Sequence, residues 1–133
     1  GRDKVVVPVG GHFAQEGRTV QMFAIKRTVR LLRRLQKAHG AGGTFAGRDL
    51  HFVGHQANLR MLETVCQQCG IAPDRHHHNV VDFGNTGAAG APSVLSMRWD
   101  DWGDADDVAV VGVGSGLTWS SFLLRFGPPE AAA

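Results

Sequence analysis

Three short glycine-containing loops hold the polar residues best placed to bind a ligand. They are residues 54–58 (Gly-His-Gln-Ala-Asn), 84–87 (Gly-Asn-Thr-Gly) and 114–116 (Gly-Ser-Gly), and each follows a segment that predicts a β-strand. In α/β proteins, ligands bind where loops leave the carboxyl ends of the strands. Three such loops could therefore converge on one site. Glycine turns are also the ordinary connections of such sheets, and spacing alone favours that simpler interpretation.

The elements around these loops predict an α/β fold. Hydrophobic periodicity and flanking glycines predict helices over 19–39, 58–68 and 88–99, and strands over 50–53, 78–83, 108–113 and 117–126. Alternation of helices and strands indicates a parallel sheet, and the last two strands make it mixed. Residues 4–9 predict a short edge strand because they contain Pro8, residues 16–18 a turn, and the acidic stretch 100–107 a solvated turn.

Composition excludes several classes of protein. The chain has 133 residues, 43% of them hydrophobic and 20% charged, which is typical of one folded domain. A net charge of +2 is too small to indicate a nucleic-acid partner. No apolar run approaches the ~18 residues of a membrane span, and no signal-peptide pattern is present. Two cysteines form no disulfide framework, so we expect a cytoplasmic location.

A zinc site is the main alternative use of the cysteines. Cys66 and Cys69 have CxxC spacing and are followed by His76, His77 and His78. The spacing to these histidines is shorter than in zinc fingers, and both cysteines fall on the apolar stripe of the 58–68 helix. We therefore expect small core side chains, with no metal and no cofactor.

The sequences of the three loops point to one family. Residues 54–60, 83–89 and 113–119 closely resemble, in order and spacing, the three C-terminal motifs of β-ketoacyl-acyl-carrier-protein synthase III. The resemblance runs from Gly17 to Phe126 and implies the C-terminal half of a thiolase-like fold, a mixed sheet flanked by helices. It divides the chain into an N-terminal segment (1–16), the synthase III domain (17–126) and a tail (127–133).

The resemblance also implies roles for individual residues. His55 and Asn85 would be catalytic, donating hydrogen bonds to the oxygen of a malonyl thioester as it decarboxylates. Ser115 would supply a backbone N–H to a second oxyanion, although a plain β-turn is the alternative. Asn58 matches a polar pocket residue or caps the next helix. Arg60 would meet the carrier protein or coenzyme A, or be a solvated surface residue.

The function implied is decarboxylative condensation of an acyl thioester with a malonyl thioester. Neither cysteine matches the family's nucleophile, so we expect that cysteine outside this segment, in the N-terminal half of the same enzyme. Expected partners are acyl-CoA, malonyl-acyl-carrier protein or malonyl-CoA, the acyl carrier protein, and a second copy in a homodimer. The pathway would be fatty acid or polyketide biosynthesis. Alternatives are an acyltransferase without decarboxylation and a non-catalytic partner subunit.

A basic stripe on the first predicted helix has three possible uses. Its members recur at three- and four-residue spacing: Lys26, Arg30, Arg33, Arg34 and Lys37. The stripe could dock an acidic carrier protein, pair with residues 100–107, or form a solvated helix face. Met22 weighs against docking, since some relatives have a lysine there. We also expect the face meant for the missing half to be exposed and apolar, which would make the isolated chain poorly soluble.

Overall fold

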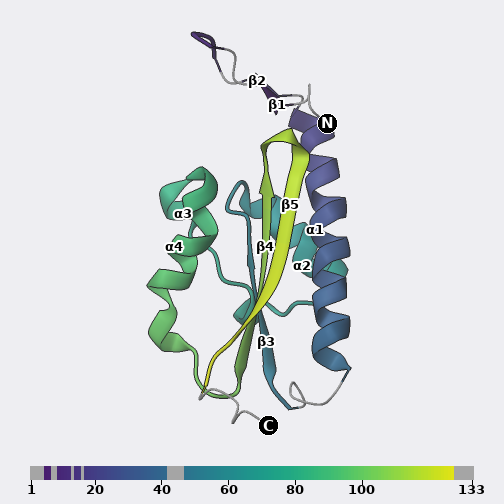
Figure 1. Cartoon of the computed structure of the whole chain (residues 1–133), viewed down its shortest axis with the longest axis vertical. Coiled ribbons are helices and arrows are strands. Elements are labelled where there is room, and N and C mark those ends of the chain that lie inside the picture. Colours follow the sequence, from purple (N-terminus) through teal and green to yellow (C-terminus); the bar gives the residue numbers. More distant parts are fainter. Residues whose placement is uncertain (1–4, 7–8, 13, 16, 42–46, 128–133) are drawn as a thin grey trace.

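The fold is a three-stranded mixed sheet with helices on both faces (Figure 1). The computed structural model describes residues 5–6, 9–12, 14–15, 17–41 and 47–127. The sheet consists of β3 (Asp49–Gly54), β4 (Asp106–Gly114) and β5 (Thr118–Arg125), in the order β3-β4-β5. β3 and β4 are parallel, and β4 and β5 are antiparallel. The predicted α/β class with a mixed sheet is confirmed.

Four α-helices accompany the sheet in the part of the chain that the structure describes. They are α1 (Gly17–Gly40), α2 (Leu59–Cys69), α3 (Val80–Phe83) and α4 (Gly90–Met97). Single 3₁₀ turns lie at Pro73–Arg75, Gly87–Ala89, Trp99–Asp101 and Ser115–Leu117. Near the N-terminus, β1 (Val5–Val6) pairs antiparallel with β2 (Ala14–Gln15). Pro8, on which the edge-strand prediction depended, lies outside the described residues.

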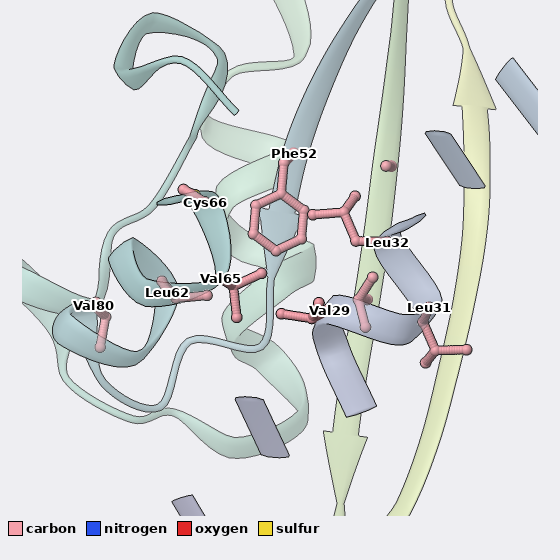
Figure 2. Close-up of a cluster of buried hydrophobic side chains, with 10 residues drawn as sticks. Val29, Leu31, Leu32, Phe52, Leu62, Val65, Cys66 and Val80 are labelled. Atoms are coloured by element: carbon pink, nitrogen blue, oxygen red, sulfur yellow. The ribbon is translucent and has the colours of Figure 1, made fainter. Parts of the chain in front are cut away.

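One face of the sheet packs against α1 and α2. Phe52 of β3 is fully buried between Leu32 of α1 and Val65 of α2 (Figure 2). Ala109 and Val111 of β4 belong to the same cluster. These positions alternate along each strand, as expected for residues on one face of a sheet. We refer to this side as the helical face.

The other face packs against α4 and the segment that follows it, on the opposite side of the sheet from α1 (Figure 1). Val53 and Val110 point to this side, where they contact Val94 of α4 and the buried Trp102. We refer to this side as the loop face.

The strand predicted over 78–83 is wrong. Residues 80–83 form α3, and only His76, just before the predicted segment, makes an isolated parallel bridge to Phe52. The valines at 80 and 81 favour a strand by propensity. A tertiary contact overrides that preference, because Gln56 Oε1 accepts hydrogen bonds from the backbone N–H groups of Asn79 and Val80.

The prediction of a solvated turn over 100–107 is wrong at its end. Asp106 and Asp107 are the first residues of β4, and Asp107 is fully buried. Its carboxylate lies 3.0 Å from Arg48 Nε and 3.2 Å from His39 Nε2, with Arg125 Nε at 3.6 Å. Opposite charges make this burial possible.

The cations that pair with Asp107 do not come from the basic stripe of α1. Among the described residues, no ion pair joins the stripe to 100–107. Arg33 instead donates to the carbonyl of Gln68 at the end of α2. Lys26, Arg30, Arg34 and Lys37 are exposed, as a solvated helix face requires.

Arg48 lies at the end of the sheet where β3 and β4 begin. Besides its ion pair with Asp107, its guanidinium donates to the carbonyl oxygens of Asp104, Asp106 and Phe126. The side chain therefore ties the residue before β3 to the start of β4 and the end of β5.

Candidate active site

The loop that carries His55 follows Gly54, the last residue of β3, where neighbouring side chains leave little room. A Cβ on Gly54 would lie 2.4 Å from Leu62 Cδ2 and 2.9 Å from Phe52 Cζ, so a larger residue would displace these two buried side chains. The chain then turns tightly, with the N–H of Ala57 donating to the carbonyl of His55 at 2.9 Å. Asn58 ends the turn as the N-cap of α2, where its side chain accepts from the N–H of Met61. His55 is thus fixed between a buried strand and a capped helix.

His55 lines a pocket of about 390 Å³ on the loop face. Most of the remaining lining is apolar or small: Ala88, Ala91, Pro92, Leu95, Val110, Gly112, Val113, Gly114, Thr118, Trp119, Ser120 and Phe122. Burial lowers the pKa of His55 below its ordinary value, because the imidazolium would lose solvation. Near neutral pH the imidazole is therefore neutral, with one N–H donor and one acceptor nitrogen.

Asn85 lies between α3 and the turn at 87–89, outside the set of residues that line the pocket. The residue is exposed. Its Oδ1 accepts a hydrogen bond from the N–H of Gly87 at 3.0 Å. This bond assigns the oxygen end of the amide and leaves the Nδ2 hydrogens available to a ligand.

Ser115 lies in the turn between β4 and β5. On either side of this turn, Gly114 and Thr118 line the pocket, so the backbone of the turn borders it. The turn uses the left-handed region twice, at Gly116 (φ 75°) and at Leu117 (φ 48°). Leu117 is only 8% exposed, and its burial offsets a conformation that a leucine rarely adopts.

The remaining predicted site residues lie away from the pocket lining. The side chain of Asn58 caps α2, which was the alternative given for it. Arg60 is exposed in the first turn of α2. The structure therefore brings His55 and the backbone of the Ser115 turn to one pocket, and leaves Asn85, Asn58 and Arg60 outside its lining.

Two aromatic residues of the pocket received no role from the sequence. Trp119 and Phe122 lie on β5, beside the pocket, and are 38% and 47% exposed. The ring of Trp119 also lies 5.7 Å from Phe23, and Arg27 Cζ lies 4.4 Å above it. Trp119 is the last residue of the 113–119 motif. Its position just after the glycine turn is the sequence feature that could have identified it as a pocket residue.

Both cysteines face the interior. Burial raises the pKa of the Cys66 thiol to about 12, and it also raises that of Cys69. Neither lines the pocket. A thiol with a raised pKa is a poor nucleophile. Among the described residues, no group of three histidine, cysteine, aspartate or glutamate side chains is placed to hold a metal ion.

Comparison with known families places the chain. Residues 44–126 match the family described as 3-Oxoacyl-[acyl-carrier-protein (ACP)] synthase III C terminal. The chain belongs to this family. Within the described residues, no helix combines the length and the apolar character needed to cross a membrane.

Curated members of the synthase III group are similar over most of the chain. Beta-ketoacyl-[acyl-carrier-protein] synthase III of Gloeobacter violaceus is 34% identical over 114 residues, which cover 84% of this chain and 33% of that protein. The enzyme of the same name from Staphylococcus saprophyticus is 33% identical over 123 residues, covering 90% of this chain and 38% of that protein. The chain spans about a third of the length of these relatives.

Solved structures of synthase III enzymes share the fold. The 3-oxoacyl-(acyl carrier protein) synthase III of Pseudomonas aeruginosa superposes with a TM-score of 0.80 at 28% identity, covering 96% of this chain and 42% of that one. The Thermus thermophilus enzyme gives 0.78 at 30% identity, over 96% and 43% of the two chains. The thiolase-like fold is therefore confirmed, and this chain corresponds to less than half of it.

Proposed function

We propose that this chain forms the His55 and Asn85 part of the active site of a 3-oxoacyl-acyl-carrier-protein synthase III. The reaction would be the decarboxylative condensation of an acyl thioester with a malonyl thioester. The observation that carries the proposal is a neutral, half-buried His55 in an apolar pocket, in a chain of this family. The relatives named above support the reaction type by their names.

His55 would act on the malonyl thioester. When the carboxylate leaves as CO₂, the electrons of the broken C–C bond form an enolate, and negative charge develops on the thioester oxygen. The N–H of the neutral imidazole can donate a hydrogen bond to this oxygen. In a pocket of mostly apolar side chains, one preorganised donor of this kind is typically worth ~3–4 kcal/mol of transition-state stabilisation.

Asn85 would be the second donor to the same oxygen. The hydrogen bond from Gly87 N–H to its Oδ1 orients the amide so that Nδ2 remains open. The enolate carbon would then attack an acyl group held on a cysteine, forming the new C–C bond while the cysteine leaves as thiolate. The backbone N–H of Ser115, in the turn that borders the pocket, would donate to the oxygen of that acyl group.

The cysteine nucleophile would lie in residues outside this segment. Cys66 and Cys69 do not qualify, because both are directed into the core with raised pKa values. We place that cysteine in an N-terminal half that completes the fold. Large exposed apolar residues on the loop face support such a covering partner: Val81, Phe83, Met97 and Trp99.

The remaining parts of the proposal concern the domain, the substrates and the complete enzyme. Residues 17–126 form the domain, flanked by an N-terminal segment and a tail. The substrates are acyl-CoA and malonyl-acyl-carrier protein or malonyl-CoA, with Arg60 as a contact for the carrier protein or coenzyme A. The complete enzyme acts as a cytoplasmic homodimer in fatty acid or polyketide synthesis and needs no metal or redox cofactor.

The test is carried out on the complete enzyme that contains this chain. We expect acyl-CoA to acylate one cysteine, seen by intact mass, and malonyl thioester to release CO₂. Asn85→Ala should lower CO₂ release on the order of 100-fold while acylation continues, since only decarboxylation uses the second donor. Gln67→Ala, which removes an exposed amide from α2, is the matched control and should change neither.

The outcomes separate the alternatives. Acylation without any CO₂ release would replace the condensing enzyme by an acyltransferase of the same fold. No acylated species in the whole assembly would exclude both enzymatic functions and leave the non-catalytic subunit.

A further inference from the structure

Gln56 is a fully buried polar side chain next to His55. Burying an amide costs free energy unless its hydrogen-bonding groups find partners. Gln56 has three: its Nε2 donates to Gly54 O at 2.8 Å, and its Oε1 accepts from Asn79 N at 3.0 Å and Val80 N at 3.2 Å. Both lone pairs of the oxygen are thus used by the start of α3, more than twenty residues away in the sequence.

The second contact of Gln56 is with α4. A Cβ on Gly90 would lie 2.7 Å from Gln56 Cβ and 3.1 Å from its Cγ, so the first residue of α4 packs directly on the glutamine stem. Asn79 reinforces this junction, because its Nδ2 donates to Ser93 Oγ at 2.9 Å. The loop after β3, the start of α3 and the start of α4 therefore meet around one side chain.

These contacts bracket the segment that carries Asn85. Val80 lies five residues before Asn85 and Gly90 five residues after it, and both touch Gln56. Residues 81–89 between them are exposed, and among the described residues the hydrogen bond of Asn85 is a local one, from Gly87 N–H to its Oδ1. The position of Asn85 relative to His55 thus depends on contacts made at the two ends of its segment.

We propose that Gln56 is a positioning residue that fixes the segment carrying Asn85 at a set distance from His55. His55 is the residue immediately before Gln56, so the amide of one residue sets both donors of the pair. The catalytic consequence rests on the proposed function. The structural consequence does not.

The test uses Gln56→Ala in the complete enzyme, with two kinds of measurement. Hydrogen exchange of the Asn79 and Val80 amides should become faster, since both lose their acceptor. CO₂ release from malonyl thioester should fall on the order of 100-fold, as a misplaced donor predicts, while acylation of the cysteine stays within about twofold of the parent. A loss caused by misfolding would lower both half-reactions together.

Three further variants sharpen this test. Gln36→Ala is the matched control: its Nε2 donates to Cys69 O between α1 and α2, far from the pocket lining, so CO₂ release should not fall selectively. The double variant Gln56→Ala/Asn85→Ala should decarboxylate about as slowly as Asn85→Ala alone, because both changes remove the same donor. Gln56→Glu loses the donor to Gly54 O, and its decarboxylation relative to the parent should recover as the pH falls and the introduced carboxyl gains a proton.

The outcomes distinguish this inference from the proposed function. If the parent enzyme does not decarboxylate, the proposed function fails, and unchanged amide exchange in Gln56→Ala would then overturn the structural role as well. If the parent is active but Gln56→Ala lowers acylation and CO₂ release equally, or if the double variant is fully additive, Gln56 does not position Asn85.

Discussion

The two faces of the sheet bury different kinds of side chain, although the same strands contribute to both. The helical face is filled by aliphatic and aromatic side chains such as Phe52 and Leu32, and its buried charge, Asp107, is paired with two arginines and lies beside His39. The loop face buries polar groups in its interior: Gln56, Asn79, and the pair His51 and His77. The first arrangement serves stability, while the second also fixes the loop that carries His55 beside the pocket.

Asp106 and Asp107 show the difference within two consecutive residues. Strand alternation sends their side chains to opposite faces. Asp107 meets Arg48 and Arg125, whose charge is independent of pH in the physiological range, and also His39. Asp106 meets His51, with Oδ1 2.9 Å from Nε2, and His51 Nδ1 lies 2.8 Å from His77 Nε2. On the loop face, the carboxylate is therefore linked to two histidines that also hydrogen-bond to each other.

The largest effect is expected in the core of the helical face. Phe52→Ala removes a fully buried ring between α1 and α2 and should lower the free energy of unfolding of the complete protein by about 3–5 kcal/mol. Denaturant unfolding measures the loss. Met22→Ala is the control, because Met22 of α1 is 57% exposed and should cost little. Equal losses in the two variants would show that the core is elsewhere.

The buried ion cluster should give the next largest effect. Asp107→Asn keeps the size of the side chain but leaves the Arg48 guanidinium without its counter-charge, which should cost about 3 kcal/mol. Asp101→Asn breaks an exposed pair with Arg98 and should cost at most about 1 kcal/mol. A small loss for Asp107→Asn in the same unfolding measurement would mean that the backbone carbonyls around Arg48 suffice.

Mild acid should loosen the loop face. Burial lowers the pKa of His77 to about 4, with His51 adding to the effect, and burial together with His78 lowers that of His76 to about 4. These values lie below the ordinary 6.5, so the unfolded chain binds protons more readily than the folded one. The stability from keeping these histidines neutral is complete above about pH 6.5 and is lost as the pH falls toward 4.

The hydrogen bond between His51 and His77 requires one of the two facing ring nitrogens to stay unprotonated. The carboxylate of Asp106 requires Nε2–H on His51, so Nδ1 must accept from His77. Arg75, Arg98 and Asp101 surround the pair and set its local charge. His77→Gln should flatten the fall of melting temperature between pH 7 and 4, and the exposed His12→Gln should leave it unchanged. Identical slopes in all three proteins would contradict this account.

The smallest effect is expected at the start of α2. Asn58→Ala removes the N-cap acceptor of Met61 N–H and should lower the free energy of unfolding by about 1 kcal/mol. Asn58→Ser, which can still cap the helix, should recover most of the loss. If Asn58→Ser is as destabilised as Asn58→Ala, the side chain contributes something other than the cap.

The sequence was most informative where periodicity and packing agree. The 19–39 and 58–68 patterns predict α1 and α2 because their apolar stripes are the surfaces that Phe52 and its neighbours contact. The pattern failed at Val80 and Val81, where β-branched residues suggested a strand and a distant glutamine made the first turn of a helix. It failed again at Asp106 and Asp107, since charge predicts exposure unless the partners are known, and Arg48 and His39 are distant in sequence.

The candidate site follows the same division. His55 and the turn at Ser115 could be found from their motifs, because each directly follows a strand. The pocket wall could not, since Ala91, Leu95 and Phe122 look like ordinary core or surface residues until α4 is placed against β4 and β5. Gln56 is part of the 54–60 motif, but the sequence does not show that its side chain contacts the starts of α3 and α4.

Arg48 has a consequence for anyone who wishes to cut or fuse this chain. Its guanidinium holds the carbonyl of Phe126, and the N–H of Phe126 donates in turn to the carbonyl of Asp106. A fusion joint or protease site placed before Phe126 would remove an acceptor from a clamp that also holds the first residues of β3 and β4. A joint placed after Gly127 would leave that clamp whole, so the safe limit for engineering is set by one side chain that is distant in sequence but lies at the same end of the sheet.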